Sequence, residues 1–369
     1  MKIENIKVAR KTGFICDESY FWHNTSGGAL FFPAGGYVQN FGMAESPESK
    51  RRFLNLLMRT GLHEALVPIK PIPATVEQLK YFHTTRHINN VKRISDSGNF
   101  EDTGIFAVAG KDTYEIAILV AGGVLEAVKA VVSGEIDNAY CLSRPPGHHA
   151  EADRGNGYCF FNNAVIAARY AQKELGLKKI MVLDWDVHHG NGIEDAFKDD
   201  DSVLFISIHQ DNLYPYNRGA MEHQGTTPES TINIPLPICG DAGYLYAFEQ
   251  IIKPATMRFK PELIIVASGL DANMYDPLSR MCITADGFGK MTSAILEIAD
   301  SVCDGRVVCT HEGGYSPEYV PFGGHAIVAA LAEADIDVID PFKGGLGFPA
   351  NLDDVAIVKI NQIKAFNNL

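Results

Sequence analysis

The chain has 369 residues, of which 46% are hydrophobic, 21% charged and 10% aromatic. These proportions are typical of a globular protein with a large core, and they exclude disordered and collagen-like chains. The 32 Lys and Arg residues against 45 Asp and Glu residues give a net charge of −13. A surface of this sign cannot neutralise phosphates, so we expect no nucleic-acid partner.

The chain shows no targeting or membrane signal. Residues 1–22 mix charged side chains with single apolar ones, unlike a signal peptide or a membrane anchor. No apolar run elsewhere approaches the roughly 20 residues that cross a bilayer, so we expect no membrane partner. The seven cysteines are scattered and form no CxxC pair, which argues against disulfides and a thiolate zinc site. We therefore expect a reduced, cytoplasmic protein.

Gly27–Gly42 is rich in glycine and aromatic residues. We interpret it as an ordinary packed loop. The rim of a pocket and a contact between subunits are the alternatives, and we expect the protein to form a homo-oligomer.

From about residue 105 onward, short apolar runs alternate with segments of helical period, which is typical of a parallel sheet with crossover helices. We predict strands at Ala139–Leu142, Ile180–Leu183, Val203–Ile208, Ile232–Ile234, Leu263–Ala267 and Val307–Thr310. Buried helix faces are predicted for Tyr244, Phe248, Ile251, Ile252 and Ala255, and for Phe288, Met291, Ile295, Ile298 and Val302. No linker divides the chain, so we expect one α/β domain over residues 1–369.

Unusual polar motifs follow four of these strands, where ligands bind in open α/β sheets. They are RPPGHHAE with His148 and His149, DWDVHHGNG at 184–192, SGLDA with Asp271, and HEGGYS with Tyr315. Four such motifs at one edge of a sheet predict an active site.

Asp184, Asp186 and His188 alternate at period two, so an extended backbone carries them to one face. With Asp271 they offer oxygen and nitrogen ligands suited to Zn²⁺, and a fourth position open to water indicates a catalytic site. The spacing does not decide which aspartates bind the metal. Strand-end capping and surface salt bridges are the alternative roles.

His148 and His149 follow a rigid Pro-Pro-Gly turn and are candidates for proton transfer near neutral pH. Tyr315 follows Gly313 and Gly314, whose backbone freedom can aim a phenol at a carbonyl oxygen. Packing in the core is the alternative for each of these three side chains.

The motifs RPPGHHAE, GYCFFNN, DWDVHHGNG, SGLDANMYDPL and EGGYS resemble those of the class II histone deacetylase family, above all its bacterial histone deacetylase-like amidohydrolases. The similarity covers about residues 80–325. It implies the arginase/deacetylase fold, a single mostly parallel β-sheet between layers of α-helices. It also implies zinc-dependent hydrolysis of an acetylated amine to acetate.

Position by position, the resemblance implies that Asp186, His188 and Asp271 bind zinc and that Asp184 orients His148. It further implies that His149 is the general base and acid and that Tyr315 stabilises the oxyanion. Asn191 stands where the class I branch has an aspartate. Because an amide cannot raise the pKa of His149 as a carboxylate would, we expect the two histidines to differ in basicity.

The family's substrate slot has aromatic walls, and here Gly157 with Tyr158, and Tyr214, occupy those places, while Leu278 matches the residue at the slot mouth. Two hydroxyl groups would suit a purely methylene chain less well. The resemblance also implies two structural potassium ions, bound largely through carbonyls. The first would lie at Asp184, Asp186, His188, Ser207 and Ile208, and the second near Phe197, Asp200 and Val203.

The substrate would be acetyl-lysine in a protein, an acetylated polyamine or another small acylated amine, and the negative net charge weakly favours cations. A binuclear manganese ureohydrolase of the same fold would need further acidic ligands where this chain has His148, Asn191 and Asn273. An inactive protein that binds acetylated amines is a second alternative, which the intact His149, Tyr315 and metal triad disfavour.

Overall fold

The computed structural model describes residues 6–225, 230–336, 338–343 and 351–369. An eight-stranded sheet runs through its centre in the order β13-β12-β11-β14-β15-β9-β1-β5, and every neighbouring pair is parallel. Its strands are β1 (Thr12–Ile15), β5 (Val67–Pro68), β9 (Asn138–Cys141), β11 (Ile180–Asp184), β12 (Val203–Gln210), β13 (Thr231–Leu236), β14 (Leu263–Ser268) and β15 (Val307–His311).

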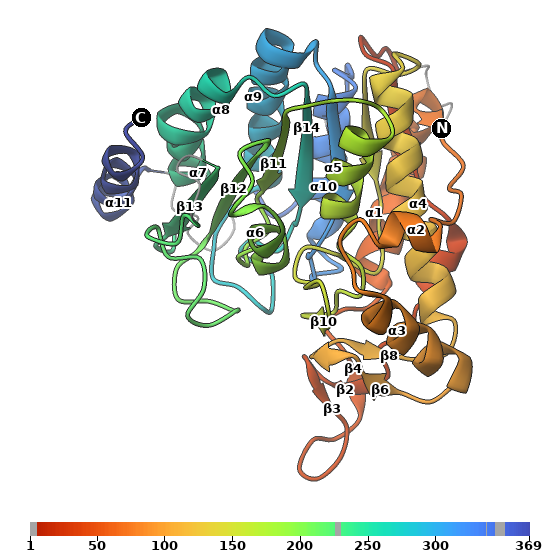
Figure 1. Ribbon diagram of the computed structural model, residues 1–369. Coiled ribbons are helices and arrows are strands. Elements are labelled where there is room, and N and C mark those ends of the chain that lie inside the picture. Colours follow the sequence, from red (N-terminus) through yellow and green to blue (C-terminus); the bar gives the residue numbers. More distant parts are fainter. Residues whose placement is uncertain (1–5, 226–229, 337, 344–350) are drawn as a thin grey trace.

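Helices cover both faces of this sheet (Figure 1). One layer contains α2 (Val76–Leu79), α3 (Thr85–Ser97), α4 (Thr113–Val132), α5 (Asn163–Lys173) and α6 (Asn191–Phe197). The other contains α1 (Glu48–Thr60), α7 (Asp241–Ala247), the π-helical η3 (Phe248–Ile252), α8 (Lys253–Phe259), α9 (Ala285–Cys303), α10 (Val320–Leu331) and α11 (Asp354–Phe366). In the described ranges, no helix is both long and apolar enough to cross a bilayer.

Two hydrophobic cores form because successive strand side chains point to opposite faces. On β11, Met181 and Leu183 join one core, whereas Ile180 and Val182 join the other. All six predicted strands are present, and this parallel sheet between helical layers confirms the expected fold. Sequence analysis missed β1 and β5, which extend the sheet beyond β9.

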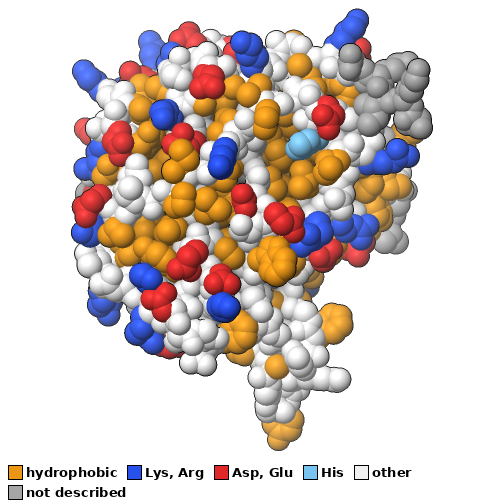
Figure 2. Space-filling model, turned by 90° about the vertical axis from the view of Figure 1, so that its right-hand side faces the viewer, with side chains coloured by type: hydrophobic (Ala, Val, Ile, Leu, Met, Phe, Trp, Pro, Cys, Tyr) orange, Lys and Arg blue, Asp and Glu red, His pale blue; other side chains and the backbone are white. Residues whose placement is uncertain are grey.

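Part of the segment predicted to be a packed loop is instead a projecting arm. The three short strands β2 (Gly27–Ala29), β3 (Phe32–Pro33) and β4 (Phe41–Gly42) pair into a small sheet below the body (Figure 1). Figure 2 shows that the arm's visible surface carries hydrophobic but no charged side chains. Its base lines a pocket through Leu30, Phe31 and Phe32, so the pocket-rim interpretation holds there.

A long connection between β9 and α5 carries the RPPGHHAE motif, and His83 fastens it. The amide of Asn162 donates to Nε2 of His83 (2.9 Å), so this nitrogen is unprotonated. Nδ1 therefore donates to the carbonyl oxygen of Glu151 (3.0 Å). Burial, with a smaller contribution from His87, lowers the pKa of His83 to about 3. The neutral ring joins the middle of the connection, at Glu151, to its end at Asn162.

We expect this histidine to make folding stability depend on pH. The unfolded ring binds a proton near pH 6.5, whereas the folded ring stays neutral until about pH 3. The unfolded state thus binds more protons between these values, and stability falls as the pH falls. The amide of His83→Gln can still donate and accept, but it does not titrate. Between about pH 7 and 5.5 its free energy of unfolding should therefore fall by about 1 kcal/mol less than that of the parent. Urea unfolding at both pH values measures this loss, and equal losses in parent and variant would contradict the assignment.

Candidate active site

The polar side chains predicted to form a site meet at the carboxyl ends of the central strands. Asp184 ends β11, Asp186 and His188 follow it, and Asp271 follows β14. All four are buried. Nδ1 of His188 lies 3.0 Å from Oδ1 of Asp186 and 3.0 Å from Oδ2 of Asp271. These three side chains form one of two groups in the described chain that could hold a metal ion.

Backbone amides fix how the two carboxylates face His188. The amide of Gly313 donates to Oδ2 of Asp186 (2.7 Å), and the amide of Val187 donates to Oδ1 of Asp271 (2.9 Å). A single ring N–H cannot satisfy both remaining oxygens, and Oδ2 of Asp271 has no hydrogen-bond partner. A divalent cation between the two buried carboxylates and the imidazole nitrogen would complete the pairing of these oxygens. Two carboxylates and one imidazole are a donor set that fits Zn²⁺.

The other candidate metal group consists of His148, Cys159 and Glu312. Oε2 of Glu312 holds the histidine turn in place, because it accepts from the amides of Gly147 (2.6 Å) and His148 (3.0 Å). Oε1 has no hydrogen-bond partner, but burial raises the pKa of Glu312 to about 8, which favours a neutral carboxyl group over a metal ligand. The sequence showed Glu312 inside the EGGYS motif but gave it no role. We interpret this group as support for the turn.

The two adjacent histidines have different partners. Nδ1 of His148 lies 3.0 Å from Oδ2 of Asp184, and Nδ1 of His149 lies 2.8 Å from Oδ1 of Asn191. Burial alone lowers the pKa of His148, but the charges of Asp186 and Asp184 outweigh it and raise the pKa to about 10. Burial and the neighbouring histidines hold the pKa of His149 well below its usual value. One ring is therefore cationic near neutral pH while the other is neutral, so they differ in basicity as expected.

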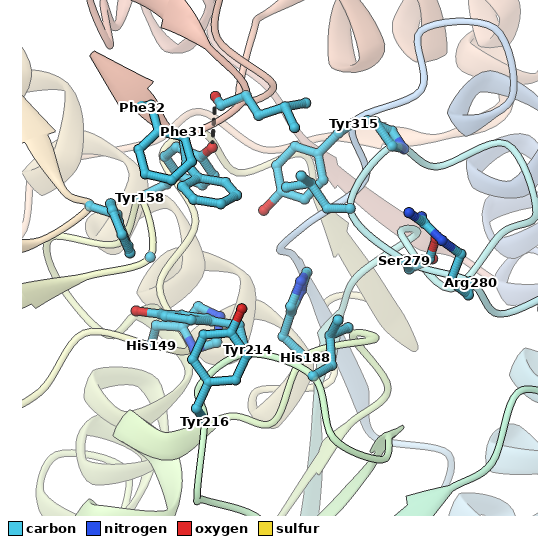
Figure 3. Close-up of a pocket in the computed structure, with 16 residues that line it drawn as sticks. Phe31, Phe32, His149, Tyr158, His188, Tyr214, Tyr216, Ser279, Arg280 and Tyr315 are labelled. Atoms are coloured by element: carbon cyan, nitrogen blue, oxygen red, sulfur yellow. Dashed lines mark hydrogen bonds between the residues drawn. The ribbon is translucent and has the colours of Figure 1, made fainter. Parts of the chain in front are cut away.

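The Tyr315 turn is held by residues from two other parts of the chain. Gly314 has φ of +125°, which favours glycine, and its carbonyl oxygen accepts from Ser49 (2.8 Å) and Lys50 (3.1 Å) on α1. The amide of Tyr315 donates to Asp276 (2.8 Å). The phenol points into the pocket toward His149 and His188 (Figure 3). Burial, with the nearby aspartates, raises the pKa of Tyr315 well above its usual value, so the hydroxyl remains a donor.

A cavity of about 500 Å³ opens over this group of side chains. It is lined by Leu30, Phe31, Phe32, Phe106, His149, Gly157, Tyr158, His188, Leu213, Tyr214, Tyr216, Pro277, Leu278, Ser279, Arg280 and Tyr315. All four residues predicted for the substrate slot are therefore on its surface. Asn191 lies behind the lining, against His149.

The hydroxyl groups of the two tyrosine walls are bonded to protein atoms. Tyr158 donates to the carbonyl oxygen of Leu30 (3.1 Å), the contact drawn dashed in Figure 3, and Tyr214 donates to Oδ1 of Asn156. The expectation that two hydroxyls would make the slot less suited to a methylene chain is thereby weakened, because the rings can offer apolar faces. Phe106 adds a wall that sequence analysis missed, with its ring centroid 6.2 Å from that of Tyr214.

Each set of residues expected to hold potassium is close together in the fold. In the first set, Asp184 on β11 is paired in register with Ser207 on β12. In the second, the amide of Asp200 donates to the carbonyl oxygen of Phe197 (2.9 Å), and the amide of Val203 donates to that of Asp200 (3.4 Å). The side-chain oxygens of Ser207 and Asp200 have hydrogen-bond partners. Unlike Asp271, they give no separate indication of a cation.

Asp276 is another functional candidate that sequence analysis left without a role. It is buried, and while Oδ2 accepts from Tyr315, Oδ1 accepts from the amide of Leu278 (2.9 Å). One carboxylate thus fixes both the phenol in the pocket and the residue at its mouth. Its place between Asp271 and Leu278 in the SGLDANMYDPL motif was the available signal.

Comparison with known proteins agrees with this geometry. Residues 43–331 match the family described as histone deacetylase domain. The chain is 42% identical to a histone deacetylase-like amidohydrolase of Pseudomonas aeruginosa, with 91% of this chain and 90% of the relative aligned. It is 36% identical to a probable deacetylase of Archaeoglobus fulgidus, over 82% and 86% of the two chains. The crystal structure of the HDA15 HD domain superposes with a TM-score of 0.84 at 26% identity, covering 97% of this chain and 94% of that chain. The chain therefore belongs to the histone deacetylase family.

Proposed function

We propose that this protein is a zinc-dependent amidohydrolase that removes an acetyl group from an amine such as acetyl-lysine and releases acetate. The observation that carries the proposal is the convergence of Oδ2 of Asp271, which accepts no hydrogen bond, with Asp186 and His188, at the base of a pocket that also presents His149 and Tyr315. We further propose that the residues named above retain the family's two structural potassium ions.

The residues divide the reaction between them. A zinc ion held by Asp186, His188 and Asp271 would polarise the amide carbonyl and acidify a water molecule. His149 is neutral and takes the proton of the attacking water at Nε2. It returns this proton to the amine nitrogen as the C–N bond breaks, so that amide and water become acetate and amine.

Charge development is met by two further groups. The Tyr315 hydroxyl donates a hydrogen bond to the carbonyl oxygen, which becomes an oxyanion as water adds. His148 is hydrogen-bonded to Asp184 beside this centre, and the Asp184 carboxylate favours the cationic form of the ring, which would stabilise the same negative charge. Neither group needs to change its protonation state during the reaction.

The pocket mouth favours an acyl-lysine or an amide with an uncharged tail. Leu278 provides no counter-charge for a second ammonium, and Arg280 contributes a cation. Among the described residues that line the pocket, none is an aspartate or a glutamate. A polyamine would thus bring an ammonium to a site without a carboxylate. Deacetylation of acetylpolyamines or other small acylamines is the alternative within this chemistry.

An inactive acetyl-amine-binding protein would have the same pocket without turnover. The position of the Tyr315 hydroxyl argues for catalysis, because it points into the pocket and makes no hydrogen bond to the described residues. A turnover assay with and without added zinc separates the two functions. Hydrolysis that depends on zinc supports the enzyme.

We expect one zinc ion per chain. Asp271→Asn should weaken zinc binding by at least about 10–100-fold, the loss known for residues that only support a metal ligand. Elemental analysis after dialysis measures the retained metal. Asp300→Asn, which alters an exposed partner of Arg10, is the control and should retain one zinc. Two equivalents of manganese in the parent protein would instead favour a binuclear site.

Tyr315→Phe removes the oxyanion donor but keeps the ring. We expect kcat to fall by about 10²–10³-fold, whereas zinc content and thermal stability should not change. Steady-state kinetics with an acetyl-lysine peptide tests this. Tyr246→Phe loses an exposed hydroxyl on α7 and should behave like the parent. A kcat close to the parent value would assign Tyr315 to packing alone.

Leu278→Glu should shift selectivity toward a polyamine, because its carboxylate would face the second ammonium of the substrate. We expect the ratio of kcat/KM for acetylspermidine to that for an acetyl-lysine peptide to rise about tenfold, which corresponds to about 1.4 kcal/mol. Leu278→Gln is the uncharged control and should leave the ratio near the parent value. A parent enzyme that already prefers acetylspermidine would contradict this assignment of the mouth.

A further inference from the structure

Behind His149, two hydrogen bonds lead away from the pocket to the carboxylate of Glu151. Nδ1 of His149 and Oδ1 of Asn191 are 2.8 Å apart. The amide nitrogen of Asn191 donates to Oε1 of Glu151 (3.2 Å) and to the carbonyl oxygen of His149 (3.5 Å). The mechanism above gives Glu151 no role.

The Glu151 carboxylate is held in place from several sides. Arg154 donates to both of its oxygens, from Nε to Oε2 (2.7 Å) and from Nη2 to Oε1 (2.9 Å). Asn156 donates to Oε1 (3.1 Å). The backbone of Glu151 is fixed as well, because its amide donates to the carbonyl oxygen of Arg154 (3.1 Å) and its own carbonyl accepts from His83. The acceptor that faces Asn191 therefore has a defined position.

The donors and acceptors of these groups determine the direction of each hydrogen bond in the network. An ionised carboxylate only accepts hydrogen bonds, so Asn191 must turn its NH₂ group toward Glu151. Its oxygen then faces His149, and an oxygen accepts only from a protonated nitrogen. Nδ1 of His149 consequently carries the hydrogen, and Nε2 keeps the lone pair that faces the pocket.

We propose that Glu151 is a positioning residue that sets the tautomer of His149 through the side-chain amide of Asn191. An amide alone cannot do this, because it offers a donor on one side and an acceptor on the other and is nearly symmetrical in shape. Turned over, its NH₂ group would donate to Nδ1 and stabilise the reverse tautomer, in which Nε2 carries the hydrogen and cannot take a proton. The effect of this tautomer on catalysis rests on the proposed function, in which His149 is the general base.

The same carboxylate connects this control to the wall of the pocket. Asn156 donates to Glu151 and accepts at Oδ1 from the hydroxyl of Tyr214. The ring of Tyr214 lies edge-on to that of His149, with centroids 5.2 Å apart. Glu151 thus orients the base and one wall of the pocket from a single position.

Glu151→Gln in the zinc-loaded enzyme tests the proposal. Glutamine has the same shape, but it can donate as well as accept, so the preference of Asn191 for one orientation is weakened to what its 3.5 Å contact with the carbonyl oxygen of His149 provides. Loss of a carboxylate that directly orients a catalytic histidine costs about 10⁴ in kcat in a serine protease, and through an intervening amide we expect a loss of about 10–100-fold. KM, zinc content and thermal stability should stay close to the parent values.

The direct readout is the tautomer itself. Nitrogen-15 NMR of histidine-labelled holoenzyme, with the His149 signals identified by their loss in His149→Ala, should show hydrogen on Nδ1 in the parent and a mixture of tautomers in Glu151→Gln. Asp153→Asn, in the same turn but paired with Arg86 at the surface, should leave both spectrum and kcat unchanged. An unchanged tautomer in Glu151→Gln overturns the proposal, whatever its activity.

A second experiment tests whether Glu151 acts on His149 through Asn191. In Asn191→Ala the amide that connects Glu151 to His149 is missing. Adding Glu151→Gln to Asn191→Ala should then change kcat by less than about twofold, because the two effects share one pathway. Losses that multiply would overturn the route. The NMR result stands even without deacetylase activity, so failure of this proposal and failure of the proposed function are distinguishable.

Discussion

The carboxylates of Asp184, Asp186 and Asp271 lie fully buried and close together in space at the ends of β11 and β14, and much of the surrounding structure serves to make this possible. Removing an ion from water is very costly unless it is paired and hydrogen-bonded. Backbone amides satisfy one oxygen each of Asp186 and Asp271, and His148 supplies a positive charge to Asp184. Oδ2 of Asp271 lies 3.0 Å from Nδ1 of His188 but accepts no hydrogen bond. A cation between these groups would complete the pairing of the buried carboxylates, so the charge balance of the site and the proposed chemistry have the same origin.

This constraint also explains why the chain uses glycine close to the carboxylates. A Cβ atom on Gly313 would lie 2.2 Å from Oδ2 of Asp271, and a side chain there would separate the amide from Asp186. Gly157 has φ of +49°, and a Cβ atom would lie 2.4 Å from the ring of His149. Backbone must approach the polar centre closely at both positions, and only glycine permits it.

Sequence analysis succeeded where local pattern and structure coincide. Strands such as β11 are buried on both faces and therefore appear as continuous apolar runs, and the residues just beyond them had to meet at one sheet edge. It failed where the structure depends on distant partners. The four residues of β1 become a strand through pairing with β9 and β5, and Lys50 reaches the Tyr315 turn from a helix 264 residues earlier in the chain. No local pattern encodes such contacts.

The base of the pocket and its mouth are consequently built in different ways. The base consists of strand ends and tight turns whose atoms are fixed by several hydrogen bonds each, so a substitution there disturbs charge balance as well as shape. The mouth combines Phe31 and Phe32 from the projecting arm, Phe106 from a short turn, and Leu278. These side chains contribute mainly apolar surface, and Phe32 belongs to a separate small sheet, with Phe31 in the turn before it. Substitutions at the mouth would therefore alter the apolar surface that meets the substrate without disturbing the buried charges at the base. Asp276 limits this independence, because its single carboxylate holds both Tyr315 and Leu278.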